Sequence, residues 1–392
     1  MKFLIFDHNS PFLSDITSFF KVHAIESVIV NTSFRNVCYD PVFRREMTQN
    51  IRDTQADLVF SLQFFPILSN ICEQQNIPYV CWCYNTTDNL LLLNNSIINP
   101  CNVIFHADSQ WIEKLQRLGC KQVYYLPWAA SSLYTSLLSD VLVPKNDVTC
   151  LDPISTDTHL AYLKLQAQTD PRTRGFLEGL LQAQEMIYGF NFLENACNQT
   201  VMQALCTAYP LSISRKTLAS LEEVYAFELL YPAVTKRETA HLLATLDHEN
   251  TIQTCLYTKR TKLETHFNRI SVLPFPETPT AIGTTYQTSR INLLISSREI
   301  QNGVPAQAFQ ILGCGGFLLT NFQNDFISLF EPDNDYVYYE SCDDMLDKIH
   351  YYLTHEDERN QIAQNARKKI LQHHTFAYRM HEMFDILQGK QS

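Results

Sequence analysis

Tyr286 to Asn321 of the chain read YQTSRINLLISSREIQNGVPAQAFQILGCGGFLLTN. The run Ile291–Ser296 is short, apolar and rich in β-forming residues, as in a buried strand that leads into a loop. A proline at the first helical turn fixes φ for helix entry, so we expect a helix to begin at Gly303–Pro305. Glycines 313, 315 and 316 should end it and release a second buried strand at Phe317–Thr320.

A strand, loop and helix in this order form a natural phosphate seat. The first amide groups of the helix have no acceptor within the helix, and the helix dipole is positive at that end. An anion that lies above the strand ends is therefore stabilised there.

The residues of this segment also resemble those of a known family. The C-terminal donor-binding domain of the CgeB-like (spore maturation protein) glycosyltransferases, members of the two-Rossmann-domain GT-B superfamily, reads roughly I-N-L-N, R-[ST]-I-x-x-G-I-P and R-x-F-[DE]-I-[ML]-G-x-G-G-F-L-L-[ST]-[ND]. The matching residues are Ile291–Leu293, Arg298, Ile300, Gly303–Pro305, Phe309, Ile311–Gly313 and Gly315–Asn321. Motifs of the family's N-terminal domain are matched by Trp82–Asn85, Ile98–Asn102, Phe105–Asp108 and Tyr124–Ala129.

The bulk composition indicates a folded, two-domain protein. The chain has 392 residues, of which 45% are hydrophobic and 18% are charged, as in globular proteins with a large core. A net charge of -11 argues against nucleic acid as the main partner, although a local basic pocket for a nucleotide diphosphate is compatible with it. The twelve cysteines form no C-x-x-C pair, which favours reduced, buried thiols over disulfides or zinc.

Neither an export signal nor a membrane span is expected. Asp7 interrupts the apolar start of the chain too early for a signal peptide. The least charged stretch, 89–107, carries five asparagines and a proline, so it does not qualify as a transmembrane helix. We therefore expect a cytoplasmic protein.

The N-terminal part alternates short apolar strands with amphipathic helices, which is typical of a parallel α/β sheet with Rossmann-like topology. Its expected strands are Lys2–Phe6, Ser27–Val30, Leu58–Leu62, Tyr79–Tyr84, Val103–Ala107 and Val123–Leu126. Ligands of such sheets bind outside the carboxyl ends of the strands. The loops at those ends are Asp7–Pro11, Gln63–Phe65, Asn85–Asp88 and Asp108–Ser109.

The predicted fold is α/β, with two Rossmann-like domains that face a cleft and a helical segment at the start of the second domain. We place the N-terminal domain at 1–140, the C-terminal domain at 145–375 and a C-terminal helix at 376–392. In the second domain, strands are expected at Asp147–Leu151, Ile252–Tyr257 and Ile270–Leu273. In GT-B enzymes the last helix commonly packs back across the first domain.

The resemblance implies a transfer reaction. A nucleotide-activated sugar would bind mainly to the second domain and the acceptor mainly to the first. Helix N-termini and basic side chains would stabilise the leaving diphosphate, so no metal or other cofactor is strictly needed. Here that task would fall to Arg298, the amides near Gly303 and the helix that starts at Val304 and Pro305. A surface or structural role is the alternative for Arg298.

Several residues depart from the family pattern at positions that would face a ligand. Gln307 and Gln310 replace the arginine and the carboxylate of R-x-F-[DE]. A glutamine keeps an acceptor oxygen for a ribose or sugar hydroxyl but loses the stronger, charge-assisted bond. Asp152-Pro153-Ile154-Ser155 replaces a V-G-S-type turn, and Asn85 stands where the family commonly has aspartate. These changes indicate altered or weakened chemistry, unless both glutamines simply solvate their helix.

Candidate acid and base groups lie near the ends of the first-domain strands. An inverting transfer would need one of them to deprotonate the acceptor hydroxyl. A histidine in a strand can equally be structural, and an aspartate before a helix can be only its cap. The candidates are Asp7, His8, Asp88, His106 and Asp108. Asp333-Asn334-Asp335 spells the D-x-D of metal-dependent transferases, but it follows Glu331-Pro332 and is better explained as a turn.

We interpret the chain as a metal-independent glycosyltransferase of the GT-B class. It would move a sugar from a nucleotide diphosphate sugar to a glycan precursor or protein acceptor. The alternative is a catalytically inactive scaffold of the same fold that binds a partner glycosyltransferase or a glycan. Gln307, Gln310 and the turn at Asp152 and Pro153 favour the alternative.

Overall fold

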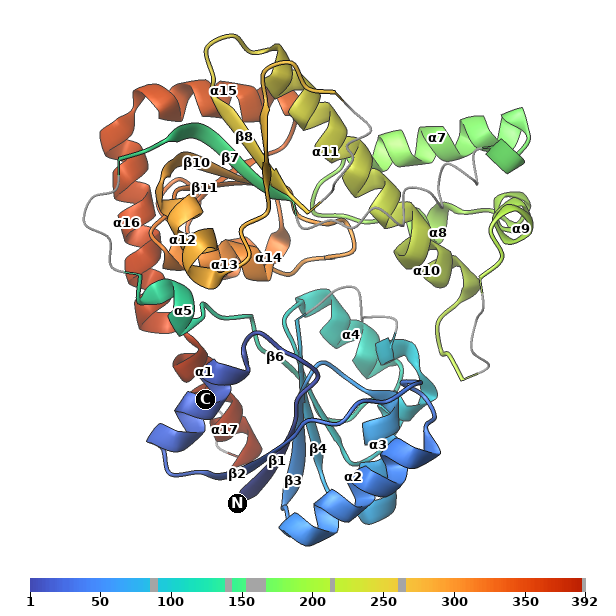
Figure 1. Ribbon diagram of the computed structural model, residues 1–392. Helices are drawn as coiled ribbons and strands as arrows, with labels where there is room; N and C mark the ends of the chain where they lie inside the picture. Colours follow the sequence, from blue (N-terminus) through green and yellow to red (C-terminus); the bar gives the residue numbers. More distant parts are fainter. Residues whose placement is uncertain (85–90, 138–142, 153–166, 212–215, 260–265, 390–392) are drawn as a thin grey trace. The chain divides into compact units, whose positions relative to one another are not determined.

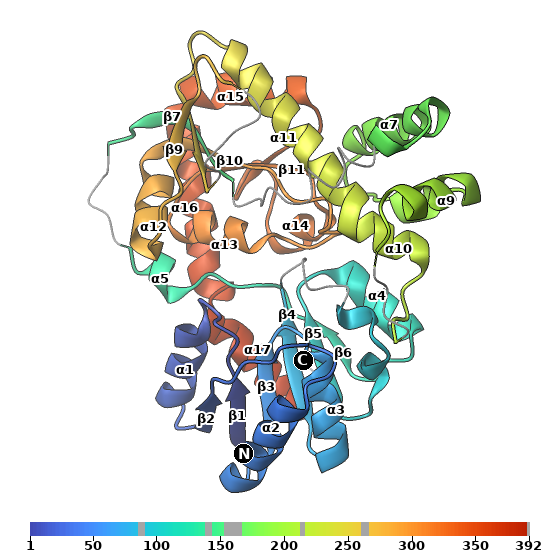
Figure 2. The ribbon, with the colours of Figure 1, turned by 45° about the vertical axis from the view of Figure 1, so that its right-hand side comes forward.

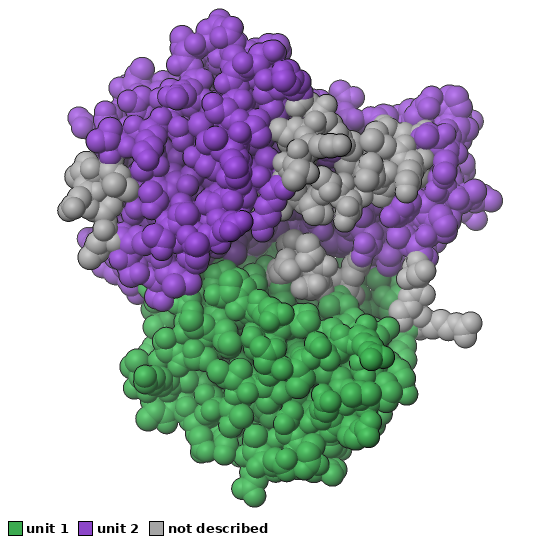
Figure 3. All heavy atoms as spheres, in the orientation of Figure 1, with its two compact units in different colours: residues 1–131, 213–219, 374–392 green, residues 132–212, 220–373 purple. Residues whose placement is uncertain are grey.

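The computed structural model describes residues 1–84, 91–137, 143–152, 167–211, 216–259 and 266–389 (Figure 1). The chain divides into two compact units, coloured separately in Figure 3. The first unit holds residues 1–131, a short segment that ends at Ala219 and the residues from His374 onward. The sequence had assigned that short segment to the second domain.

The first unit is built on a parallel sheet with strand order β2-β1-β3-β4-β5-β6. The strands are β1 (Lys2–Phe6), β2 (Glu26–Val30), β3 (Leu58–Leu62), β4 (Tyr79–Cys83), β5 (Asn102–His106) and β6 (Val123–Tyr125). All six predicted strands are confirmed, with ends that differ by at most one residue. Their near-continuous apolar runs reflect burial on both faces of a parallel sheet.

Helices flank this sheet. They are α1 (Leu13–Val22), α2 (Pro41–Thr54), α3 (Pro66–Gln75), the 3₁₀ turn η2 (Asn95–Ile98), α4 (Ser109–Arg117) and α17 (Phe376–Leu387). The final helix packs beside α1, where the ring of Phe384 lies 5.3 Å from that of Phe3 and 5.9 Å from that of Phe20. The last helix of the chain therefore belongs to the core of the first unit.

The second unit contains another parallel sheet, with strand order β12-β11-β10-β7-β8-β9. The strands are β7 (Asn146–Asp152), β8 (Thr254–Thr258), β9 (Ser271–Pro274), β10 (Ser289–Leu294), β11 (Leu318–Asn321) and β12 (Val337–Tyr339). Five of them were predicted. The short β12 had not been singled out.

The helices of the second unit include a group, α7 to α11 with η3, that lies between β7 and β8 in the sequence. The described helices of the unit are α5 (Ser132–Thr135), α7 (Pro171–Glu185), α8 (Leu193–Ala196), α9 (Gln199–Ala208), α10 (Leu221–Tyr225), the π turn η3 (Ala226–Leu230), α11 (Tyr231–His248), α12 (Pro279–Gln287), α13 (Ala306–Gly313), α14 (Asn324–Leu329), α15 (Cys342–Thr354) and α16 (Glu356–His373). Figures 1 and 2 both show α7 to α10 gathered beyond α11, away from the sheet.

The segment from β10 to β11 follows the expected order of strand, loop, helix and strand. Pro305 is the N-cap of α13, with φ -58° and ψ 141°, so the helix begins one residue later than the proline. At the other end Gly315 has φ +79°. The Gly316 amide donates to the Ile311 carbonyl at 2.9 Å, and the Gly315 amide donates to the Leu312 carbonyl at 3.0 Å. These two bonds form a Schellman cap, which satisfies the last carbonyls of the helix.

Gly316 is also required by close packing against β10. A Cβ atom at Gly316 would lie 2.7 Å from Nδ2 of Asn292. That amide donates to the carbonyls of Tyr286 at 3.1 Å and Phe317 at 3.2 Å. The asparagine of the I-N-L motif and the last glycine of G-x-G-G are therefore one packing unit.

Each sheet has one point where the strand order reverses. In the first unit the chain passes from β1 to β2 on one side and then to β3 on the other. In the second unit it passes from β7 to β8 and β9, and then returns to β10 on the opposite side of β7. Open parallel sheets bind ligands at the carboxyl ends of the strands beside such switch points. The topology thus predicts one ligand-binding place in each unit, at its switch point.

Candidate functional site

The switch point of the second unit lies between β7 and β10, and α13 begins there. Nε2 of Gln307, in the first turn of α13, donates to the carbonyl of Leu151 on β7 at 3.2 Å. The buried residues 303–305 lead into this turn, and Gln310 is half-buried one turn further along. The first amides of α13 therefore lie at the carboxyl end of β7, where they can hold an anion.

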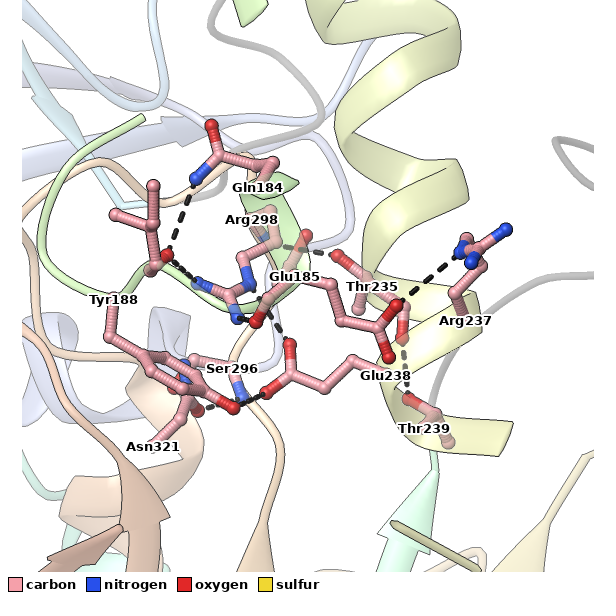
Figure 4. A network of polar contacts seen from close by, with 12 residues as sticks. Gln184, Glu185, Tyr188, Thr235, Arg237, Glu238, Thr239, Ser296, Arg298 and Asn321 are labelled. Atoms are coloured by element: carbon pink, nitrogen blue, oxygen red, sulfur yellow. Dashed lines mark hydrogen bonds and ion pairs between the residues drawn. The ribbon is translucent and has the colours of Figure 1, made fainter. Parts of the chain in front are cut away.

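The loop between β10 and α13 is anchored at several points (Figure 4). The amide of Ser296 donates to Oδ1 of Asn321 at 2.7 Å, which ties the loop to the end of β11. The amide of Arg298 donates to Oγ1 of Thr235 on α11 at 2.8 Å. Further along, Oδ1 of Asn302 accepts from Nδ2 of Asn324 at 2.8 Å. These bonds fix the path of the chain into α13.

Arg298 is the centre of this anchoring. Its Nε donates to Oε2 of Glu238 at 2.9 Å, its Nη1 to the carbonyl of Ile187 at 2.9 Å and its Nη2 to the carbonyl of Glu185 at 3.0 Å. Its Cζ lies 4.2 Å from the ring centroid of Tyr188. The side chains of Arg298 and Glu238 are 3% and 2% exposed. The guanidinium therefore connects three chain segments inside the unit.

This geometry favours the structural alternative that the sequence left open for Arg298. All three guanidinium nitrogens already donate to protein acceptors, so a direct bond to a diphosphate would need a rearrangement of the buried network. The structural alternative describes its position better. Arg298 acts on the loop between β10 and α13 by holding it, while the amides of Gly303, Val304, Ala306 and Gln307 remain the candidates for the diphosphate.

Glu238 and Tyr188 complete the network but carry no signal in the sequence. The hydroxyl of Tyr188 donates to Oε1 of Glu238 at 2.9 Å. Burial raises the pKa of Glu238, and the charge of Arg298 opposes that rise. Tyr188 lies 50 residues before Glu238 in the sequence, and Glu238 lies 60 residues before Arg298. No motif links residues so far apart, so only the tertiary structure reveals the pairing.

The switch point of the first unit lies between β1 and β3, and it brings together two of the predicted groups. Asp7 and His8 follow β1, and Gln63 follows β3. Oδ1 of the buried Asp7 accepts from the amide of Ser10 at 3.0 Å. The exposed His8 ring stacks on Phe34, with the ring centroids 4.9 Å apart. Asp7, His8 and Gln63 line one cavity of about 140 Å³.

His106 and Asp108 lie elsewhere and build a turn. Nδ1 of His106 accepts the amide of Asp108 at 3.0 Å, and Oδ1 of Asp108 accepts the amide of Gln110 at 3.0 Å as the N-cap of α4. Burial lowers the pKa of His106 to about 3, so its ring stays neutral at ordinary pH. The expected cap at Asp108 is confirmed, and both side chains have structural tasks here.

The four predicted acid and base groups that the structure describes, Asp7, His8, His106 and Asp108, do not form one site. β1 and β5 are separated in the sheet by β3 and β4, a distance of roughly 14 Å at the usual strand spacing. A single acceptor hydroxyl cannot reach Asp7 and His106 together. Asn85, Asp88 and the turn 153–155 lie outside the described residues.

Metal-binding motifs gain no support from the described residues. Residues 333–335 form a turn, as predicted. Oδ2 of the buried Asp335 accepts from Nζ of Lys369 at 2.7 Å and from the amide of Glu331 at 2.9 Å. No group of three His, Cys, Asp or Glu side chains suited to a metal ion occurs in the described part of the chain. None of its helices is long and apolar enough to cross a membrane.

Residues 240–385 match a family model described as glycosyl transferase-like. Curated protein sequences give no match. Among solved structures, Anabaena Alr3699/HepE in complex with UDP-glucose has a TM-score of 0.55 and 10% sequence identity, with 99% of this chain and 100% of that chain covered. Sucrose-phosphate synthase from Thermosynechococcus elongatus has a TM-score of 0.54 and 8% identity over 100% of both chains. The fold is that of the GT-B glycosyltransferases.

A third structure with the GT-B fold agrees with this assignment. A UDP-forming trehalose-phosphate synthase from Burkholderia xenovorans has a TM-score of 0.51 and 8% identity, with 100% of this chain and 99% of that chain covered. The family match at 240–385 extends from α11 to α17 and includes the whole segment from β10 through α13 to β11. The matched part therefore includes β10 and α13 at the second switch point, while β7 lies before it in the sequence.

Proposed function

We propose that this protein is a glycosyltransferase that moves a sugar from a nucleotide diphosphate sugar to a glycan precursor or a protein acceptor. One observation carries the proposal. The glycosyl transferase-like match falls on the unit whose switch point places the N-terminus of α13 at the carboxyl end of β7. That arrangement suits a diphosphate, because helix N-termini stabilise anions without a counter-ion.

The donor would bind to the second unit. The backbone amides of Gly303, Val304 and Ala306 and the first turn of α13 would face the diphosphate, with Pro305 setting the helix entry. Gln310 would accept hydrogen bonds from a ribose or sugar hydroxyl, and Arg298 would keep the loop in place. The Anabaena protein, which is similar in fold, was solved with UDP-glucose, and a uridine nucleotide is the first donor to test.

Finer features of the proposal follow the sequence resemblance. A CgeB-like transferase would work in the cytoplasm without a metal ion, because helix amides stabilise the leaving group. Asp7 or His8 would serve as the base toward the acceptor hydroxyl. A partner glycosyltransferase would be compatible with the exposed helices of the second unit.

The test is a titration of the full chain with UDP, GDP, TDP and CDP and their common sugar conjugates, followed by thermal unfolding. A ligand that binds only the folded state at a hundredfold excess over Kd stabilises it by about 2.7 kcal/mol. We expect one nucleotide class to shift the unfolding temperature. No shift with any member of the panel would contradict the transferase.

Gln310→Glu sharpens this test, because it restores a carboxylate to α13. A bond to a charged acceptor is worth about 1 kcal/mol more than a neutral one, so the donor should bind roughly fivefold more tightly. Gln361→Glu is the matched control, since Gln361 is an exposed glutamine on α16. Equal donor affinity in Gln310→Glu and wild type would show that Gln310 does not contact the donor.

The second candidate function is a non-catalytic scaffold that binds a partner enzyme or a glycan. It is favoured by Gln307, whose amide is tied to the Leu151 carbonyl of the sheet where the family pattern has an arginine. Gln307→Arg distinguishes the two. A gain in nucleotide affinity would support a weakened transferase. No nucleotide binding by either Gln307→Arg or the wild type would support the scaffold.

A further inference from the structure

The switch point of the first unit contains a strained residue. Gln63, directly after β3, has φ +80°, a conformation that costs a residue other than glycine about 1–2 kcal/mol. Its backbone is held there by hydrogen bonds at both its amide and its carbonyl. The amide donates to the Trp82 carbonyl at 3.0 Å, and the carbonyl accepts from Oγ of Ser61 at 2.7 Å.

The side chain of Gln63 is buried and only half satisfied. It is 6% exposed. Oε1 accepts from the amide of Tyr84 at 3.2 Å, while Nε2 has no hydrogen-bond partner among the described residues. A buried donor without an acceptor is destabilising. Backbone strain and an unpaired donor in one residue at a switch point indicate a place kept for a ligand.

The chemistry of the cavity limits what that ligand can be. The described residues of its lining include no lysine or arginine; their polar side chains are those of Asp7, His8, Asn9, Ser10, Gln63 and Tyr84. Residues 85–90, which follow Tyr84 in the sequence and lie outside the described residues, read Asn-Thr-Thr-Asp-Asn-Leu and include no lysine or arginine. A phosphate or carboxylate would meet the charge of Asp7 with no lysine or arginine in the described lining to offset it. A hydroxyl can donate to Asp7 and accept from Gln63.

The size of the cavity and its aromatic lining also favour a small neutral ligand. The cavity measures about 140 Å³, well below the roughly 300–1,000 Å³ of pockets for drug-sized ligands. Phe6, Phe65 and Tyr84 also line it. The cavity therefore offers an apolar wall and the two buried polar side chains of Asp7 and Gln63 to a ligand of the size of a single ring. It is too small for a nucleoside diphosphate.

We infer that this cavity binds a neutral, unphosphorylated sugar unit of the acceptor, with Nε2 of Gln63 donating to one ligand oxygen and the Asp7 carboxylate accepting from a ligand hydroxyl. This inference rests on the proposed glycosyl transfer, because only that reaction makes the bound sugar an acceptor. The site itself consists of first-unit residues alone. Gln63 is its specificity-determining residue, because Nε2 of Gln63 is the one fully buried side-chain donor without a protein partner among the described residues that line the cavity.

The experiment measures binding of small sugars to the full chain by saturation-transfer NMR. The neutral probes are methyl α-glucoside, methyl β-galactoside, methyl α-mannoside and N-acetylglucosamine. Glucose 6-phosphate and mannose 6-phosphate are the anionic probes. We expect at least one neutral probe to bind and both phosphates to bind at least tenfold more weakly. Preference for the phosphates, or no binding by any neutral probe, would overturn the inference.

Variants locate the binding. Gln63→Glu keeps the acceptor for the Tyr84 amide and removes the donor, so the neutral probe should bind about three- to tenfold more weakly. Gln55→Glu is the matched control, because Gln55 is also left-handed, with φ +52°, but exposed at the end of α2. Asp7→Asn removes the charge and should narrow the discrimination against the phosphates. Unchanged affinity in Gln63→Glu, or unchanged discrimination in Asp7→Asn, would contradict the inference.

The same samples separate this inference from the proposed function. Nucleotide binding belongs to the second unit and is measured in the same tubes with UDP, GDP, TDP and CDP. If a nucleotide binds and no neutral sugar does, the transferase stands and the inference fails. If a neutral sugar binds through Gln63 and no nucleotide does, the sugar site stands and the transferase fails.

Discussion

The buried pair of Arg298 and Glu238 makes the most direct prediction about what holds the donor loop. Arg298→Met removes the guanidinium and leaves the Glu238 carboxylate, which is 2% exposed, with the Tyr188 hydroxyl as its remaining neighbour in the network. Breaking one partner of a buried ion pair typically costs about 3–5 kcal/mol. The free energy of unfolding should fall by that amount at neutral pH.

Two further variants isolate the pair. Glu238→Gln should cost a similar amount, and the double variant should cost less than the sum, with a coupling of about 1–3 kcal/mol. Arg290→Met is the matched control in the same unit. Its ion pair with Asp147 has an N–O distance of 2.7 Å but is partly exposed, at 44% and 17%, so its loss should cost at most about 1 kcal/mol. Urea unfolding followed by circular dichroism measures all of them.

The pH dependence provides an independent check. Burial raises the pKa of Glu238, and Arg298 counteracts this, so in Arg298→Met the folded-state pKa rises further. A carboxyl with a raised folded pKa stabilises the fold below the unfolded pKa and loses that contribution as the pH rises through the folded pKa. The deficit of Arg298→Met should therefore be largest at neutral pH and shrink toward pH 4. A loss below about 1 kcal/mol combined with lost nucleotide binding would refute the structural role.

Two other predictions follow from single residues. Because burial lowers the pKa of His106 to about 3, the folded state resists protonation and stability should fall between pH 6.5 and 3 by up to about 1.4 kcal/mol per pH unit. His106→Asn, which keeps an acceptor for the Asp108 amide, should lose that part of the slope in urea titrations at pH 4.5 to 7.5, and an unchanged slope would count against it. Gly316→Ala should cost about 1–3 kcal/mol because its Cβ would lie 2.7 Å from Asn292. Gly179→Ala, inside α7 with nothing within 4 Å, should stabilise by about 0.5–1 kcal/mol; equal effects of the two changes on the unfolding midpoint would refute the packing argument.

Local patterns were enough to find most of the elements. The apolar runs that became β1 and β3 were predicted to the residue, because buried parallel strands are apolar along their whole length. The glycines after α13 were correctly placed as its end, since Gly315 needs a positive φ. Pro305 was assigned to the first turn and is instead the N-cap, an error of one residue that local sequence cannot resolve.

Side-chain partners were harder to predict than elements. Asp108 was recognised as a cap because its partner lies two residues away. Arg298 was assigned to the diphosphate because a motif gives the residue type and not the direction of the side chain. Its partner Glu238 lies 60 positions earlier on α11, and nothing in the sequence links the two.

The sequence by itself determined the two α/β halves, the strand, loop and helix order of residues 286–321 and the loops where ligands should lie. These depend on neighbours in the chain, on apolar periodicity and on backbone preferences of proline and glycine. Only the tertiary structure decided that Arg298 is held in a buried network, that two strands separate those of Asp7 and His106, and that Gln63 is strained with an unpaired side-chain amide. Those features depend on which distant segments pack together, and burial of a polar group becomes visible only when every group around it is in place.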